Sequence, residues 1–199
     1  MLNRITLVTM FSLAGLLWAG AAFGHDGASL PYGSFMGGLT HPVLGSDHFL
    51  AMVCVGILSA QIGGRAIWTV PVTFVSVMAF GGLLGWIDVG LSAIEFGIAC
   101  SVLALGIAIA LDRKFPLSLA MSVVGFFAIF HGYAHGAEMP VVAKPVTYAL
   151  GFMTGTAVLH IMGLVIGDIS QHYARGKLLL RVSGVAIAGI GAAFLIGAA

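Results

Sequence analysis

Long apolar stretches, interrupted by short polar or glycine-containing segments, make up most of this sequence. A helix needs about 20 mainly apolar residues to cross the hydrocarbon core of a membrane. The short connections favour antiparallel neighbouring helices. The pattern therefore predicts an all-α membrane protein, a bundle of six transmembrane helices, over residues 34–60, 66–87, 90–111, 116–135, 146–167 and 178–197.

The first 24 residues have the pattern of a secretory signal peptide. Arg4 supplies the early positive charge, residues 5–18 are mostly apolar, and residues 22–24 (Ala-Phe-Gly) form a small-x-small cleavage site. Cleavage there leaves residues 25–199 as one six-helix transmembrane domain that begins with His25. An uncleaved anchor is the alternative, and both arrangements place residue 25 outside the cytoplasm.

The basic residues orient the spans. With residue 25 outside, all of the eight lysines and arginines except Lys144 lie on the inner side, as the positive-inside rule requires. This predicts a multi-pass protein of the bacterial inner (plasma) membrane with its mature N-terminus outside. Two groups of three spans would be related by an inverted repeat. The residues do not align well enough to decide, so two inverted three-helix halves are left open.

Composition agrees with a membrane location and excludes other classes. Only 8% of the residues are charged, against about 25% in an ordinary soluble protein. The net charge of +1 gives no electrostatic reason to expect nucleic acid binding. Cys54 and Cys100 lie inside apolar runs, which indicates small buried side chains rather than a disulfide framework.

Two clusters of histidine and carboxylate residues interrupt the apolar spans. An ionised Asp near the bilayer centre costs about 2.5–3.5 kcal/mol on insertion scales, so such groups normally face a partner or a wet cavity. A straight helix turns about 100° per residue, which places positions i and i+7 on one face and i, i+4 and i+7 within about 60°. The clusters are His41, Asp47 and His48 in the first span, and His131, His135 and Glu138 at the end of the fourth.

We expect the first and fourth helices to pack together with these ligand faces opposed. Gly132 and Gly136 form a GxxxG pair that permits close approach of another helix. Pro42 has two interpretations: it starts the helix with His41 as the cap, or it kinks a longer helix and frees the Gly38 carbonyl.

Helix rise arranges the candidate ligands as a ladder of two tiers. Neutral imidazole suits nickel, cobalt, zinc and copper, whereas magnesium and calcium prefer oxygen ligands, and protonation should weaken binding below about pH 6. For His160 alone, a hydrogen bond to a neighbouring helix is the alternative. The shallow tier contains His41, His135 and Glu138, and the deeper tier contains Asp47, His48 and His131, with His160 near the level of His48.

At these motifs the sequence resembles the HupE/UreJ family of nickel and cobalt permeases. The His-x5-Asp-His pattern is matched by His41, Asp47 and His48. The Phe-His-Gly-x-Ala-His-Gly-x-Glu pattern is matched by Phe130, His131, Gly132, Ala134, His135, Gly136 and Glu138.

The resemblance implies transport of nickel or cobalt into the cytoplasm by a secondary transporter or facilitator that is not an enzyme. The partners expected are the divalent metal ion and the lipid bilayer, with no prosthetic group. His25, with its free amine after cleavage, is a candidate for capturing the ion at the entrance. No phosphate-binding GxxxxGKS pattern occurs, so ATP coupling would need a partner.

Three alternatives remain at this level. A metal-dependent intramembrane hydrolase would use the same ligands to hold zinc, with Glu138 or Asp47 as the base. A bis-histidine haem protein would use His48 and His131 as axial ligands. In the third alternative the polar side chains only join helices through hydrogen bonds. Such bonds contribute about 0.6 kcal/mol each in membranes, which is little stabilisation for so many buried polar groups.

Overall fold

The computed structural model describes residue 30 and residues 32–197, so the predicted signal peptide and His25 lie outside the described residues. Within that range the chain forms helices and no strands. The helices are α2 (Gly33–Leu44), α3 (Ser46–Ile62), α4 (Ala66–Trp86), α5 (Ile94–Leu111), α6 (Leu117–Ala137), α7 (Pro145–Gln171) and α8 (Ala174–Leu195).

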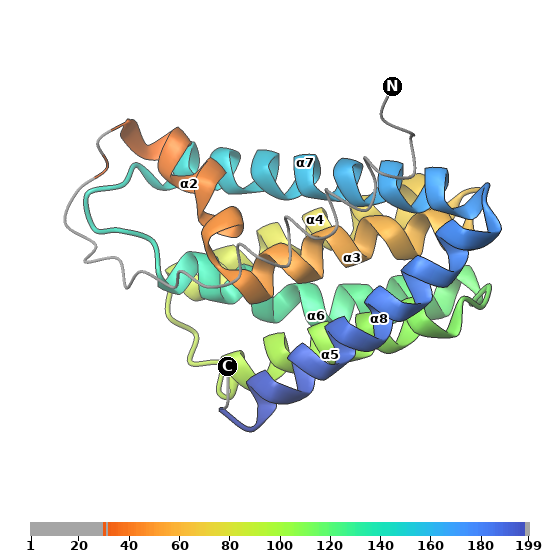
Figure 1. The fold of residues 1–199 in the computed structure, drawn as a ribbon. Coiled ribbons are helices and arrows are strands. Elements are labelled where there is room, and N and C mark those ends of the chain that lie inside the picture. The colour runs from red at the N-terminus through yellow and green to blue at the C-terminus, as the bar shows by residue number, and fades with distance from the viewer. Residues whose placement is uncertain (1–29, 31, 198–199) are drawn as a thin grey trace.

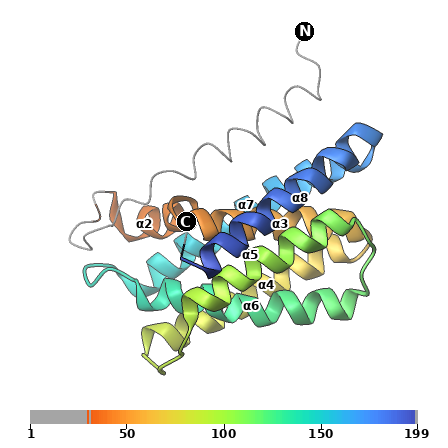
Figure 2. The same ribbon diagram turned by 60° about the horizontal axis from the view of Figure 1, so that its bottom comes forward.

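The helices associate mainly in pairs that are distant in the sequence. α4 packs most extensively against α6, α5 packs against α8, and α7 packs against both α2 and α3 (Figure 1). The turned view in Figure 2 shows the same neighbours, with α8 along α5 and α4 along α6. The interior between these pairs is where the histidines lie.

Five helices, α4 to α8, are each long and apolar enough to cross a membrane. α2 and α3 meet that test only when taken together, and they are bent by 83° relative to each other. The predicted all-helical membrane architecture is therefore confirmed for five candidate spans. Residues 34–60, predicted as one span with a possible kink at Pro42, thus form two helices with a sharp break between them.

The break between α2 and α3 falls at Gly45, which has extended backbone angles (φ −82°, ψ 117°). Pro42 lies inside the last turn of α2, where it has no N–H to bond the carbonyl four residues earlier. Glycine then adds a helix-propensity penalty of about 1 kcal/mol. The interpretation of Pro42 as a helix start capped by His41 was wrong, because the helix runs through both residues.

α3 begins again immediately after the break. The Phe49 N–H donates to the Gly45 carbonyl at 2.8 Å. The His48 N–H, one of the first-turn donors that a helix leaves unpaired, donates to Oδ1 of Asp47 at 2.7 Å. Asp47 thereby stabilises the start of α3 as well as facing the histidines.

The other predicted boundaries differ mostly at helix ends. α5 begins four residues later than expected, because Asp88, Gly90 and Ala93 have positive φ angles and interrupt the helix. α7 and α8 nearly meet, so most of the predicted polar connection over residues 168–177 is helical.

Glycines allow the helix pairs to approach closely. A Cβ atom on Gly163 of α7 would overlap the Val53 carbonyl oxygen of α3, and one on Gly56 would overlap the His160 carbonyl oxygen of α7. Between helices in lipid there is little hydrophobic driving force, so such close packing becomes a main source of association. Many of the helical glycines in the described residues serve this purpose, in several helix pairs.

The helix that approaches the GxxxG pair of α6 is α4. A Cβ on Gly132 would overlap the Met78 carbonyl oxygen, and one on Gly136 would overlap the Gly82 carbonyl oxygen. Both of these oxygens belong to α4. The pair therefore joins α6 to α4, and α6 touches α3 only over a short stretch. The prediction that the ligand faces of the first and fourth spans oppose each other is nevertheless confirmed, because His41 and His48 both lie next to His135.

One carboxylate joins three helices at the end of the bundle opposite the break in the first span. Asp112, directly after α5, accepts hydrogen bonds from the side-chain amides of Gln61 at 3.1 Å and Gln171 at 3.0 Å. The Gln61 amide also donates to the Ile109 carbonyl at 3.2 Å. This cluster holds the adjoining ends of α3, α5 and α7 together.

We predict that Gly163→Ala lowers the thermal unfolding temperature of the purified protein, because the new methyl group must displace α3. Overpacking of this kind typically costs about 1–3 kcal/mol. Gly189→Ala is the matched control: its Cβ would meet nothing within 4 Å, and the better helix propensity of alanine should leave stability equal or raised. Equal unfolding temperatures for the two variants would contradict the packing argument.

Candidate functional site

Four histidine rings meet where the broken first span faces α6. The ring centroids lie 4.9 Å apart for His41 and His135, 4.6 Å for His48 and His135, and 4.9 Å for His48 and His131. The contacts form a continuous series from His41 to His131. The bend at Gly45 makes it possible, because α2 presents His41 and α3 presents His48 to the same helix from different directions.

Acidic side chains contact this series at its more exposed members. Nε2 of His41 lies 3.3 Å from Oε2 of Glu138, and Nδ1 of His48 lies 3.0 Å from Oδ1 of Asp47. The Glu138 and Asp47 side chains are 51% and 25% exposed, whereas His131 and His135 are fully buried. The site therefore has carboxylates at its rim and imidazoles inside.

Several buried imidazole nitrogens have no hydrogen-bond partner among the described residues. They are Nε2 of His48, Nδ1 of His131 and both ring nitrogens of His135. Leaving a buried polar atom unpaired typically costs about 1–3 kcal/mol. An unprotonated ring nitrogen carries a lone pair that can bind a transition metal, so this arrangement has the donor atoms that a soft or borderline cation needs.

The rings pack edge to face against one another rather than pointing at a common centre. In the part of the chain that the structure describes, no group of three or more His, Cys, Asp or Glu side chains has the arrangement of a finished metal site. Binding an ion here would require these side chains to rotate.

His160 lies apart from the four-ring series. Its ring contacts Phe74 at a centroid distance of 5.1 Å, and Phe74 contacts His131 at 5.6 Å. Phe74 of α4 thus lies between the two histidines. The alternative for His160, a hydrogen bond to a neighbouring helix, is not formed within residues 32–197, where neither ring nitrogen has a partner.

Aromatic side chains of α7 form one wall of the site and were not predicted from the sequence. Phe152 stacks on His135 at 5.0 Å with an interplanar angle of 19°, and Tyr148 lies 6.1 Å from His41. Both are buried. A signal for them existed: Tyr148, Phe152, Thr156 and His160 follow one another at i+4 spacing, which places them on one face of a helix.

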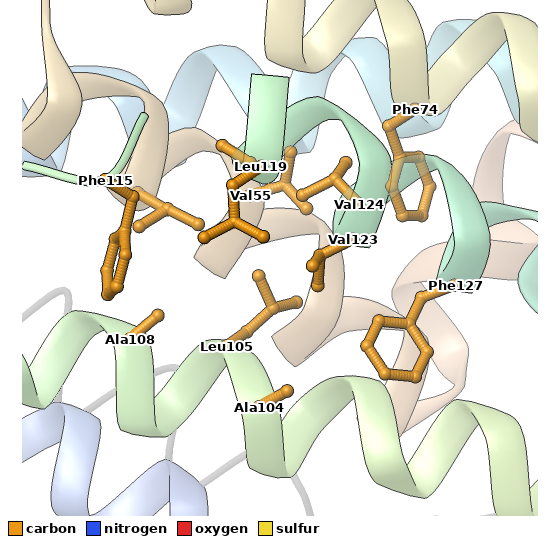
Figure 3. A pocket seen from close by; sticks show the side chains of 12 residues that line it. Val55, Phe74, Ala104, Leu105, Ala108, Phe115, Leu119, Val123, Val124 and Phe127 are labelled. Atoms are coloured by element: carbon orange, nitrogen blue, oxygen red, sulfur yellow. The ribbon is translucent and has the colours of Figure 1, made fainter. Parts of the chain in front are cut away.

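An apolar cavity of about 130 Å³ lies beyond Phe74. Figure 3 shows side chains of α3, α5 and α6 around it, including Val55, Leu105 and Val124, with Phe74 towards one end and Phe115 towards the other. Every side chain that lines it is apolar. The cavity, which is separated from the histidine series by Phe74, therefore offers no side chain that could bind a metal ion.

Comparison with known proteins identifies relatives along nearly the whole chain. A family model described as HupE / UreJ protein matches residues 13–194. A protein of Rhizobium leguminosarum bv. viciae described as Protein HupE is 41% identical over 186 residues, which cover 94% of this chain and 96% of the relative. No solved structure matches this chain.

The ion pair at the rim leads to a prediction about Glu138, which lies just after the end of α6. The hydrogen bond from His41 is the largest influence on this carboxyl and holds its pKa below the ordinary value, against the opposing effect of partial burial. The contribution of this pair to the free energy of unfolding is fully present at pH values above the ordinary pKa of a glutamate. It is lost as the pH falls through the lowered pKa of Glu138 in the folded protein. His41→Ala should therefore raise the pKa of Glu138.

The measurement is a ¹³C NMR titration of protein labelled at the glutamate carboxyl carbons. The chain has two glutamates, Glu95 and Glu138, so a Glu95→Gln variant assigns both signals. His172→Ala is the control, since the ring of His172 bonds the nearby Asp168 carbonyl and forms no ion pair with a carboxylate among the described residues. An unchanged Glu138 midpoint in His41→Ala would show that the ion pair does not form in solution.

Proposed function

The chain belongs to the HupE/UreJ family, and from that membership and its buried histidines we propose that it transports a divalent transition metal ion. The proposed cargo is nickel or cobalt, carried into the cytoplasm across the bacterial inner membrane. The protein acts as a secondary transporter or facilitator, not as an enzyme.

The observation that carries this proposal is the continuous series of imidazoles between helices, with a carboxylate at each of its more exposed members. Imidazole nitrogen is a ligand that nickel and cobalt accept readily, while the carboxylates offset the charge of the ion. A series of neighbouring donors suits passage, because an ion can exchange one ligand for the next without regaining its full hydration shell.

The proposed topology counts α2 and α3 as one broken span and gives six spans in total. Transporters commonly place their binding sites where a transmembrane helix is interrupted, and the break at Gly45 lies beside His41, Asp47 and His48. An inverted repeat would relate the first, second and third spans to the fourth, fifth and sixth. It would therefore relate the packing of α4 against α6 to the packing of α7 against the first span, and both of these packings are among the most extensive in the structure. This correspondence supports the inverted-repeat hypothesis.

In the proposed path the ion first meets Glu138 and His41 at the outer rim, after capture by His25 at the mature N-terminus. It loses water as His135, His48 and Asp47 bind it, and it then reaches His131. Beyond His131 the apolar cavity offers no ligand, and Phe74 separates His131 from His160, the remaining candidate ligand. Release to the inner side therefore requires a rearrangement that moves Phe74 or separates α3 from α6.

Uptake of radioactive nickel or cobalt into liposomes containing the purified protein tests the proposal. Asp47→Asn and His131→Gln should reduce uptake to the level of empty liposomes, because the first removes the negative charge and the second removes the imidazole nitrogens. His172→Gln should transport like wild type, since this exposed histidine lies outside the site. Competition between the two ions and an imposed pH gradient would identify the cargo and the coupling.

The opposite results are informative. Wild-type protein that stays folded but moves neither ion would refute the transport proposal. Zinc-dependent cleavage of a lipid or peptide by the same preparation, abolished in Asp47→Asn, would favour the intramembrane hydrolase instead.

A further inference from the structure

Ser101 is a buried polar residue that the transport path does not use directly. It lies in α5 with no exposed surface. Its hydroxyl oxygen is 2.6 Å from the Ile98 carbonyl oxygen of the same helix and 2.8 Å from Nε2 of His131 in α6. Both neighbours are within hydrogen-bond distance of a hydroxyl group that has a single proton.

These distances determine which group donates to which. A carbonyl oxygen only accepts, so the short contact with Ile98 requires the Ser101 hydroxyl to donate its proton there. The same hydroxyl can then only accept from His131, and Nε2 of His131 must carry the hydrogen. In a neutral imidazole the other nitrogen is then unprotonated, and Nδ1 of His131 is buried without a partner among the described residues.

We propose that Ser101 is a positioning residue that holds His131 in the Nε2–H tautomer, so that Nδ1 is the nitrogen that binds the transported metal ion. The assignment of the metal rests on the proposed function, whereas the tautomer follows from the contacts of Ser101 alone. Histidines that bind metals usually donate their second ring N–H to a carboxylate, carbonyl or other acceptor, which fixes the ring and its tautomer.

His48 is held in the complementary tautomer by a different acceptor. Its Nδ1 lies 3.0 Å from the ionised Asp47 carboxylate, which can only accept, so Nδ1 carries the hydrogen and, in a neutral ring, Nε2 is unprotonated. Nε2 of His48 is also buried without a partner within the described range. The adjacent rings, 4.9 Å apart, thus offer opposite nitrogens: Nε2 from His48 and Nδ1 from His131.

The first experiment measures the tautomer in metal-free wild-type protein by ¹⁵N NMR of ring-labelled histidine, with the His131 signals assigned by their loss in His131→Gln. The two ring nitrogens have distinct shifts according to which one is protonated. We expect the Nε2–H form of His131 in wild type and a changed nitrogen pattern in Ser101→Ala. An Nδ1–H form in wild type would overturn the inference without reference to any variant.

Ser59→Ala is a closely matched control. Ser59 in α3 is also fully buried and donates to a carbonyl of its own helix, that of Val55, at 2.6 Å. It forms no hydrogen bond with a histidine in the part of the chain that is described. Ser59→Ala removes a buried serine hydroxyl from a helix, as Ser101→Ala does, but it leaves the hydrogen-bond acceptor of His131 in place. The histidine spectrum of Ser59→Ala should therefore match that of wild type.

The second experiment measures nickel binding to the purified variants by calorimetry. Removal of a group that orients a metal-binding histidine typically weakens affinity about 10–100-fold, which we expect for Ser101→Ala, while Ser59→Ala should bind like wild type. Equal affinities of the two variants would overturn the positioning role. Wild-type protein that binds neither nickel nor cobalt would instead overturn the proposed function. The tautomer of His131 is measured by NMR without metal, so the tautomer assignment can be tested separately from the proposed function.

Discussion

Close approach of helix backbones at glycines is the constraint on which the rest of the structure depends. Gly56 of α3 lies against the His160 carbonyl of α7, and Gly132 of α6 lies against the Met78 carbonyl of α4. Lipid offers little hydrophobic drive for association between helices, so these contacts decide which helices become neighbours. They place α6 beside α4 and the first span beside α7, and the histidine rings meet in the space between these two pairs.

The distribution of charge within the site follows from the same packing. The carboxylates of Asp47 and Glu138 keep partial contact with the surroundings, while His131 and His135 are enclosed. An enclosed carboxylate would carry a large desolvation cost, whereas a neutral imidazole carries a much smaller one. The arrangement therefore allows imidazole side chains to lie deep in an apolar bundle without fixing net charge there.

The sequence allowed the helical architecture, five of the candidate spans and the family motifs to be identified, because apolar length and motif spacing are local properties. It did not reveal that the first span breaks at Gly45, since proline and glycine near a histidine are compatible with either a kink or a start. It also did not reveal the partner of Gly132 and Gly136, because spacing identifies a face and not its neighbour. Ser101 was missed because one serine in an apolar helix has no distinguishing pattern.

The shared carboxylate of Asp112 has a mechanical consequence for α3. At the C-terminal end of α3, any displacement must break the hydrogen bonds of Gln61 to Asp112 and Ile109. At its N-terminal end, the Gly45 carbonyl accepts its hydrogen bond from Phe49 of α3 itself. The 17 residues of α3 span about 25 Å, so a tilt of about 5° about Asp112 displaces His48 by about 2 Å at constant helix length. A tilt of α3 about this end would therefore displace the histidine-bearing start of the helix most, and the close contacts of Gly56 and Gly163 between α3 and α7 oppose it.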